Sequence, residues 1–426
     1  MGQYFLVIIN SLLYIGLLYW YWKKVRCFNI GILLLCLWAA TSAGAIYYYG
    51  TGMYEWKYPF TLVPFLYLFI CVFIYILPVL RFRNEKIDTI ITNDKIVQLI
   101  AVIISCIAIL PFLENFFQLF HVMGQGAQIT DVINDRYADD TYDQYYYMSK
   151  LGRSLQWYNN NCGIVSTCLL IYQFTRKKIK YYLIIGLSCS ILCIYFAAVN
   201  TGARYILVKN LLLFVVYYMI FLKHIPQKIR GKLNKILSYV AITIFVAIAA
   251  ISIYRFSDMV DTRYVNFSML DWLSLYFSES YLNFNGDMWY IDNYLWGRNT
   301  AFLQRYILGI TEHVVGRDFE SFAAVTHIRM HVFYTMIGDI YSDFGPYLTL
   351  LVVSVVSLLF CKVCQIRKKM QLSKIIFLGI IAKACFVGYE YYTYNGDEYQ
   401  IIFTPLICFF IYIFENKRSA NKYFKY

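Results

Sequence analysis

The sequence predicts an all-α membrane protein, a polytopic helix bundle whose chain crosses a bilayer about eleven times. The 426 residues are 60% hydrophobic and only 15% charged, whereas soluble chains carry about a quarter charged residues. The charges are gathered in short clusters between apolar runs. Each run has the roughly 20 residues that one helical crossing requires. No separate soluble domain is apparent, so residues 1–426 are expected to form a single membrane domain.

The apolar runs end in aromatic side chains, which prefer the interface between membrane and water. Tyr19–Trp22 and Tyr47–Tyr49 are examples. The predicted spans are Tyr4–Trp22, Phe28–Tyr49, Pro59–Leu80, Ile96–Phe117, Trp157–Phe174, Tyr181–Val199, Tyr205–Leu222, Ile236–Tyr254, Tyr347–Cys361, Ile375–Tyr392 and Ile401–Phe414.

Basic residues are unequally distributed between the two sides of this bundle. Alternate connecting segments hold 25 of the 38 Lys and Arg but only 4 of the 25 Asp and Glu. Such an excess marks the cytoplasmic side. It predicts an exoplasmic N-terminus and a cytoplasmic C-terminus, and it explains the net charge of +13 without a nucleic-acid partner. The cytoplasmic segments are 23–27, 81–95, 175–180, 223–235, 362–374 and 415–426.

Two exoplasmic segments are too long to be turns, a first loop at 118–155 and a large loop at 255–346. Within the large loop, Ser268–Leu282 and Asp292–Gly309 have helical apolar spacing, which predicts helices along the interface. His331–Tyr341 is apolar enough to enter the membrane as part of a re-entrant hairpin. Any chemistry is therefore expected in these loops and in the helix ends beneath them.

Arginine is concentrated on the predicted exoplasmic side. Outside the cytoplasmic segments 9 of 13 basic residues are Arg, against 7 of 25 within them. A guanidinium binds phosphate or carboxylate through two parallel hydrogen bonds, so this bias favours anion recognition; pairing with the surplus exoplasmic acids is the alternative. The candidates for binding a pyrophosphate are Arg204, Arg298, Arg305 and Arg329.

The spacing of these arginines supports their selection. Arg204 closes the short connection Asn200–Arg204 between two spans, where it can bind a substrate phosphate or reach a lipid phosphate. Arg298 and Arg305 are seven residues apart, so a helix would place them on one face with Phe302 between them. Two guanidiniums beside an aromatic ring suit a pyrophosphate next to a sugar, and a solvated helix face is the alternative.

Polar residues at four-residue intervals, His331, Thr335, Asp339 and Asp343, predict one polar stripe on an otherwise apolar helix. Polar stripes at membrane depth are costly and commonly functional. His331, Asp339 and Asp343 are therefore candidate catalytic residues, one of them as general base towards a sugar hydroxyl. Asp343 also fits a cap at the start of the next span, within Ser342–Pro346. A divalent cation is a further alternative for these ligands, but the spacing is not specific and no cofactor or metal site is predicted.

Three segments carry a resemblance to a known family. They are Thr201–Arg204 at the start of a span, Leu295–Thr300 in the large loop, and Ile337–Gly345 leading into a late span. In this order they resemble the Wzy-type polymerases of bacterial oligosaccharide repeat units, which act in O-antigen and capsule assembly. The N-terminal half of the chain resembles that family only as a string of hydrophobic helices.

The resemblance implies a glycosyltransferase of the bacterial cytoplasmic (inner) membrane. At the outer face, a glycan linked to undecaprenyl pyrophosphate would be transferred onto an incoming lipid-linked repeat unit. Undecaprenyl pyrophosphate would leave, stabilised by arginines, while a carboxylate or His assists the acceptor hydroxyl. The implied partners are lipid-linked glycans, membrane lipid, and a chain-length regulator and flippase of the same pathway.

Two alternatives share the lipid and the bundle. A lipid-linked oligosaccharide flippase is expected to have two related halves and a charged central cavity, and the absence of an evident repeat favours an enzyme. Another lipid-phosphate-dependent glycosyltransferase or ligase is chemically closer.

Overall fold

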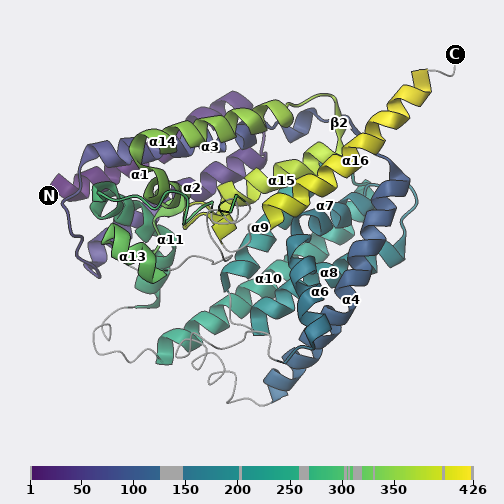
Figure 1. Ribbon diagram of the computed structural model, residues 1–426, viewed down its shortest axis with the longest axis horizontal. Helices are drawn as coiled ribbons and strands as arrows, with labels where there is room; N and C mark the ends of the chain where they lie inside the picture. Colours follow the sequence, from purple (N-terminus) through teal and green to yellow (C-terminus); the bar gives the residue numbers. More distant parts are fainter. Residues whose placement is uncertain are drawn as a thin grey trace. The chain divides into compact units, whose positions relative to one another are not determined.

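The computed structural model describes residues 2–124, 147–200, 204–258, 268–301, 305, 308–309, 319–329, 332–395 and 399–423. Helices account for most of them (Figure 1). They are α1 (Gly2–Val25), α2 (Ile30–Thr51), α3 (Leu62–Arg81), α4 (Asp94–Gly124), α6 (Lys150–Asn161), α7 (Gly163–Gln173), α8 (Tyr181–Asn200), α9 (Arg204–Phe221), α10 (Gln227–Asp258), α11 (Met269–Gly286), α13 (Phe319–Thr326), α14 (Thr335–Val363), α15 (Leu372–Val387) and α16 (Gln400–Tyr423), with short strands β1 (Thr89–Ile91) and β2 (Lys369–Gln371).

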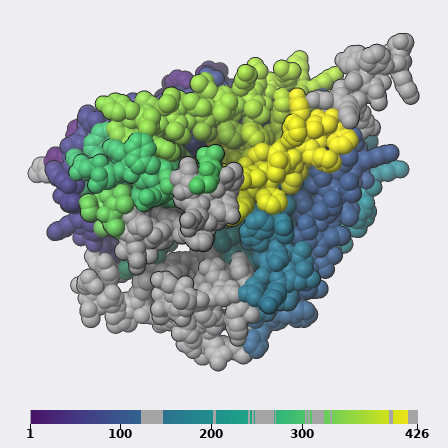
Figure 2. Space-filling view, viewed as in Figure 1, coloured from purple at the N-terminus to yellow at the C-terminus, as the bar shows by residue number. Residues whose placement is uncertain are grey.

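Seven helices in the described part of the chain are long and apolar enough to cross a membrane. They are α1, α2, α3, α4, α8, α9 and α14, and each overlaps one predicted span over most of that span's length. Helix α14 also exposes large apolar side chains, including Leu351 at 58% and Leu358 at 67% of their surface. Its light-green side chains form a continuous strip in Figure 2. Such a strip is expected where lipid covers the protein, so the chain is a multi-pass membrane protein.

The other four predicted spans stay predictions. Trp157–Phe174 is divided between α6 and α7 at Cys162. The break follows three asparagines, whose side chains compete for backbone hydrogen bonds; Asn161 Nδ2 donates to the Trp157 carbonyl at 2.9 Å. The remaining three predicted spans fall on α10, α15 and α16, and α15 ends at Val387, five residues before the predicted boundary at Tyr392.

The chain divides into two compact units, each assembled from segments distant in sequence. Unit 1 comprises residues 1–87, 259–367 and 381–398. Unit 2 comprises residues 88–258, 368–380 and 399–426.

In unit 1, α11 packs against α2. The helix begins with a capping box, in which Ser268 and Asp271 satisfy each other's backbone N–H groups. Gly44 of α2 leaves room for Ser278, since a Cβ at Gly44 would lie 2.3 Å from Ser278 Oγ. The predicted helix over Ser268–Leu282 is therefore confirmed. Its C-terminal half is buried within the unit instead of lying along its surface.

Aromatic rings form the core beneath α11. Tyr281 makes edge contacts with Tyr14 of α1 and Trp38 of α2, at centroid distances of 5.5 and 6.0 Å. Two of these rings also have a polar partner: Thr41 and Tyr281 share a hydrogen bond of 2.8 Å, and Trp38 Nε1 donates to the Cys385 carbonyl at 3.0 Å. Buried rings with satisfied polar atoms fix the register of α11 on α2.

Helix α14 runs alongside α3 (Figure 1). The re-entrant hairpin over His331–Tyr341 stays a prediction, since His331 lies outside the described residues. Helix α14 consists of two helical segments, one from Thr335 and one that contains the predicted span from Tyr347, and they join at Gly345, whose backbone is not helical. Gly345 has a φ of 67°, and a Cβ there would lie 2.6 Å from the Tyr294 ring, so only glycine fits. Pro346 follows, and its missing N–H suits a broken helix.

In unit 2, α4 packs against α8, and the two strands pair. Strands β1 and β2 are parallel, with Ile90 opposite Met370. Helix α15 follows β2 directly, and α4 begins three residues after β1. The short sheet thus joins two connections that are predicted to be cytoplasmic.

Candidate functional site

The polar face of α14 lies against the loop that follows α11 and the short 3-10 helix η3 (Met288–Tyr290). Asp343 accepts three hydrogen bonds there: from Asn299 N at 2.9 Å, and from Thr300 N and Oγ1 at 2.6 and 2.5 Å. All three residues are buried. Hydrogen bonds to a charged acceptor are stronger than neutral ones, so Asp343 anchors the loop. The predicted role of Asp343 as a helix cap is not seen, because its carboxylate binds the loop instead. A helix break within Ser342–Pro346 is present, at Gly345.

Asp339 lies one helical turn before Asp343 and binds the same loop through Asn299. We call the hydrogen bonds of Asp339 and Asp343 to Asn299 and Thr300 the anchor. Asp339 Oδ1 accepts from Asn299 Nδ2 at 3.2 Å and its Oδ2 from the Tyr392 N–H at 2.7 Å. Thr335 Oγ1, at the start of the same helix, accepts from Gly338 N at 3.2 Å. The predicted stripe therefore exists over Thr335, Asp339 and Asp343, and its described members all bind backbone or side-chain donors of unit 1. His331 lies outside the described residues.

The anchored loop turns sharply at Trp296 and Gly297. Both have positive φ values, 51° and 84°, and the Arg298 N–H donates to the Leu295 carbonyl at 3.2 Å. A four-residue turn with two left-handed central residues is type I′, and it favours glycine but not tryptophan. The prediction of a helix over Asp292–Gly309 is therefore wrong at this point, because the backbone reverses at Trp296 and Gly297.

This turn determines where two of the candidate arginines lie. Arg298 is exposed and follows the turn directly. Arg305 folds back, and its Nη1 donates to the Trp296 carbonyl at 2.6 Å. Beyond the turn, Ala301 N donates to the Gly297 carbonyl and Arg305 N to the Ala301 carbonyl, both at 3.0 Å, which is the spacing of a helix. Phe302 lies outside the described residues, so the shared helix face of Arg298 and Arg305 stays a prediction. We call Leu295–Ala301 the arginine loop.

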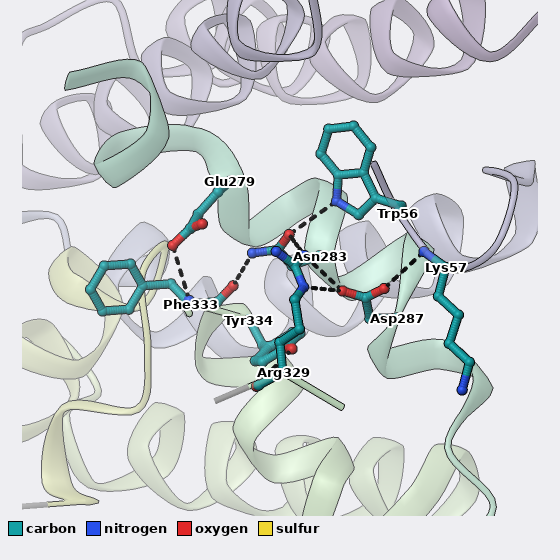
Figure 3. Close-up of polar contacts among 8 residues, drawn as sticks. All are labelled: Trp56, Lys57, Glu279, Asn283, Asp287, Arg329, Phe333 and Tyr334. Atoms are coloured by element: carbon teal, nitrogen blue, oxygen red, sulfur yellow. Dashed lines mark hydrogen bonds and ion pairs between the residues drawn. The ribbon is translucent and has the colours of Figure 1, made fainter. Parts of the chain in front are cut away.

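Arg329 lies in a different network of unit 1, shown in Figure 3. Its guanidinium donates to Asp287 Oδ2 at 2.8 and 3.1 Å and to Asn283 Oδ1 at 2.7 Å. Its Cζ lies 3.1 Å from the centroid of the Tyr54 ring. A phosphate would have to compete with Asp287 for this guanidinium. The geometry thus favours a structural role, and pyrophosphate binding by Arg329 stays a prediction.

The same network buries a carboxyl group that the sequence reasoning missed. Glu279 is 3% exposed, and its Oε1 accepts from the Phe333 N–H at 3.1 Å (Figure 3). Burial raises the pKa of Glu279 to about 7, against hydrogen bonds and Arg329, which lower it. Glu279, Asn283 and Asp287 follow at intervals of four, the same signal that identified the α14 stripe.

Replacing Glu279 with glutamine should stabilise the protein at alkaline pH. The folded protein holds the proton more tightly than the unfolded chain, so wild-type stability falls as pH rises from 4.5 to about 7. Glutamine keeps an oxygen for Phe333 without that penalty. We expect the free energy of unfolding of Glu279→Gln to exceed wild type by roughly 2–3 kcal/mol at pH 8 and by little at pH 4.5.

The measurement is the unfolding midpoint in an uncharged detergent at both pH values. Glu55→Gln is the matched control because the Glu55 side chain is exposed. An equal effect of Glu279→Gln at both pH values would contradict the assignment of a raised pKa.

Arg204 begins α9 in unit 2, and its side chain lies outside what the structure describes. Among the described residues, no three His, Cys, Asp or Glu side chains are grouped as metal ligands. Two of the three segments that carry the family resemblance, Leu295–Thr300 and Ile337–Gly345, bind each other through the anchor.

Comparison with known proteins returned no match to a family model, a curated protein or a solved structure.

Proposed function

We propose that this protein polymerises oligosaccharide repeat units carried on undecaprenyl pyrophosphate, at the outer face of the bacterial cytoplasmic membrane. The arginine loop carries the proposal. Buried aspartates of a membrane helix hold this loop, and the loop presents an exposed guanidinium. A lipid-anchored donor requires a membrane-embedded catalyst, and an anionic leaving group requires a preorganised cation.

Arg298 is assigned to the departing pyrophosphate. Its backbone is fixed on both sides, by the turn at Trp296 and by the Asn299 N–H bond to Asp343. A cation held on a rigid loop needs little reorganisation free energy to stabilise the negative charge that develops in the transition state. Arg305, which donates to the Trp296 carbonyl, supports the loop and adds positive charge beside it.

The proposed step exchanges one bond for another at the donor sugar. The acceptor hydroxyl oxygen attacks the anomeric carbon, and the bond from that carbon to the pyrophosphate oxygen breaks. Undecaprenyl pyrophosphate leaves with the bonding electrons, and a general base takes the hydroxyl proton. Asp339 and Asp343 already accept hydrogen bonds with both oxygens, which favours loop anchoring over proton transfer; His331 remains a candidate base.

The test is reconstitution. The purified protein is supplied with radiolabelled lipid-linked repeat units in vesicles, and products are separated by glycan length. Chain growth with release of undecaprenyl pyrophosphate is expected. Transfer of the label across the bilayer without a new glycosidic bond would indicate a flippase, and transfer onto a different acceptor lipid would indicate a ligase.

A further inference from the structure

The arginine loop displays a tryptophan at its turn. The Trp296 side chain is 63% exposed, although its neighbours in sequence, Leu295 and Gly297, are buried. Arg298 is also exposed. Two residues of extended chain span about 7 Å at most, so the backbones of Trp296 and Arg298 lie within that distance. One small ligand can therefore reach both side chains.

The backbone of Trp296 is strained. Its φ of 51° lies in the left-handed region, which bulky side chains rarely adopt. Trp296 and Gly297 are the two central residues of the type I′ turn, and the pair that this turn prefers is Asn-Gly. The chain has the expected glycine at the second position and a tryptophan at the first. Stability alone would favour asparagine at 296.

The surrounding structure holds Trp296 in this conformation. Its N–H donates to the Asp343 carbonyl at 3.0 Å, and the preceding Leu295 N–H donates to the Ser342 carbonyl at 2.9 Å. Its own carbonyl accepts from Arg305 Nη1 at 2.6 Å. A strained residue persists only where several contacts fix it, and such residues are concentrated in ligand-binding and active sites.

Anchoring in the membrane surface is the other common role of an exposed tryptophan. Trp20 and Trp22 of α1 suit that role, because they are 50% and 48% exposed on an ordinary helix. An anchor needs neither a left-handed backbone nor bound peptide groups. The exposed residues nearest to Trp296 in sequence, Asn293 and Arg298, are polar. These differences favour a ligand over lipid.

The side chains define the class of ligand. An indole ring offers a flat apolar surface to the C–H face of a sugar, and a guanidinium binds phosphate. A sugar joined directly to a pyrophosphate presents both groups side by side. We propose that Trp296 is the surface on which this sugar ring stacks, beside the pyrophosphate bound by Arg298. The inference rests on the proposed function, since the pyrophosphate is the one assigned there to Arg298.

The test measures binding by the full-length protein in an uncharged detergent. Isothermal titration calorimetry uses three short-chain lipids: farnesyl pyrophosphate without a sugar, and the same lipid carrying N-acetylglucosamine or galactose. We expect at least one sugar-bearing lipid to bind about tenfold more tightly than the sugar-free lipid, as expected for one stacked ring.

Replacing Trp296 separates stacking from structure. Trp296→Asn creates the preferred pair of the turn, so the unfolding midpoint should stay equal or rise while the preference for sugar is lost. Affinity for the sugar-free lipid should not change. Trp296→Leu keeps an apolar side chain without a flat ring and should lose the preference as well, which provides a second test if the asparagine variant fails to fold.

Two other variants serve as comparisons. Trp20→Asn removes an exposed tryptophan of α1 and should change none of the three affinities. Arg298→Ala should weaken binding of all three lipids alike and keep the preference for sugar, because it removes the partner of the phosphate and leaves the ring in place.

Three results would overturn the proposal. They are equal binding of all three lipids by the wild-type protein, a preference for sugar that survives in both Trp296 variants, and equal weakening of all three lipids by these variants, which would assign Trp296 to contact with the lipid. A protein that extends no glycans but loses its preference for sugar on replacement of Trp296 would retain this inference and lose the proposed polymerase function.

Discussion

Chain growth should fall about 100- to 1,000-fold when Arg298 is replaced with alanine, because one preorganised group that stabilises developing negative charge contributes this much to a rate. Arg298 is exposed, so its removal leaves the anchor of Asp343, Asn299 and Thr300 intact. The measurement is the initial rate of glycan extension by the purified protein, with membrane insertion and unfolding midpoint recorded alongside.

Two further variants sharpen this test. Arg298→Lys keeps the charge but not the planar pair of donors, so it should recover only a small part of the rate. Arg367→Ala removes an exposed arginine at a predicted cytoplasmic connection and should leave the rate unchanged. Normal glycan lengths in Arg298→Ala would refute the pyrophosphate assignment, whatever the behaviour of the lysine variant.

Arg329→Ala should instead act on stability. Asp287 is buried, with 5% of its side chain exposed, and the variant would leave its carboxylate without its ion pair. Loss of one partner from a buried pair costs about 3–5 kcal/mol; the 26% exposure of Arg329 places the expected loss near 3 kcal/mol. Arg329→Lys should recover little, because lysine cannot bind Asp287 and Asn283 together while stacking on Tyr54. Unfolding in an uncharged detergent measures the change.

A double variant provides the control. Removing Asp287 and Arg329 together should destabilise the protein less than the sum of the two single changes, because no charge is left unpaired. If Arg329→Ala kept its stability but lost chain growth, Arg329 would belong with the substrate, as the sequence had suggested.

The sequence was most informative where periodicity alone determines structure. Within the described residues, the apolar runs predicted the seven helices that are long and apolar enough to cross a membrane, and the apolar spacing from Ser268 predicted α11. The stripe of Thr335, Asp339 and Asp343 was correctly placed on one helix. These features depend on residues within a few turns of one another, and a sequence shows such local relations directly.

The sequence reasoning failed where distant contacts override local spacing. Asp292–Gly309 has a helical pattern, but Trp296 adopts a left-handed conformation because the loop is tied to Asp343, more than 40 residues away. The role of Asp343 as an anchor was also unpredictable, since two of its three donors are backbone N–H groups, which any sequence provides. The stripe of Glu279, Asn283 and Asp287 was readable from spacing but was hidden among aromatic residues.

The pairing of β1 with β2 has a consequence for membrane topology. Parallel neighbours put the starts of α4 and α15 at the same level, so the chain leaves this sheet before α4 and returns to it before α15 on one side of a membrane. The number of crossings between Asp94 and Gln371 must consequently be even. If α6, α7 or α10 is counted as an additional crossing, a second crossing must be added or removed between the two strands. The three-residue sheet therefore allows only even numbers of crossings between β1 and β2.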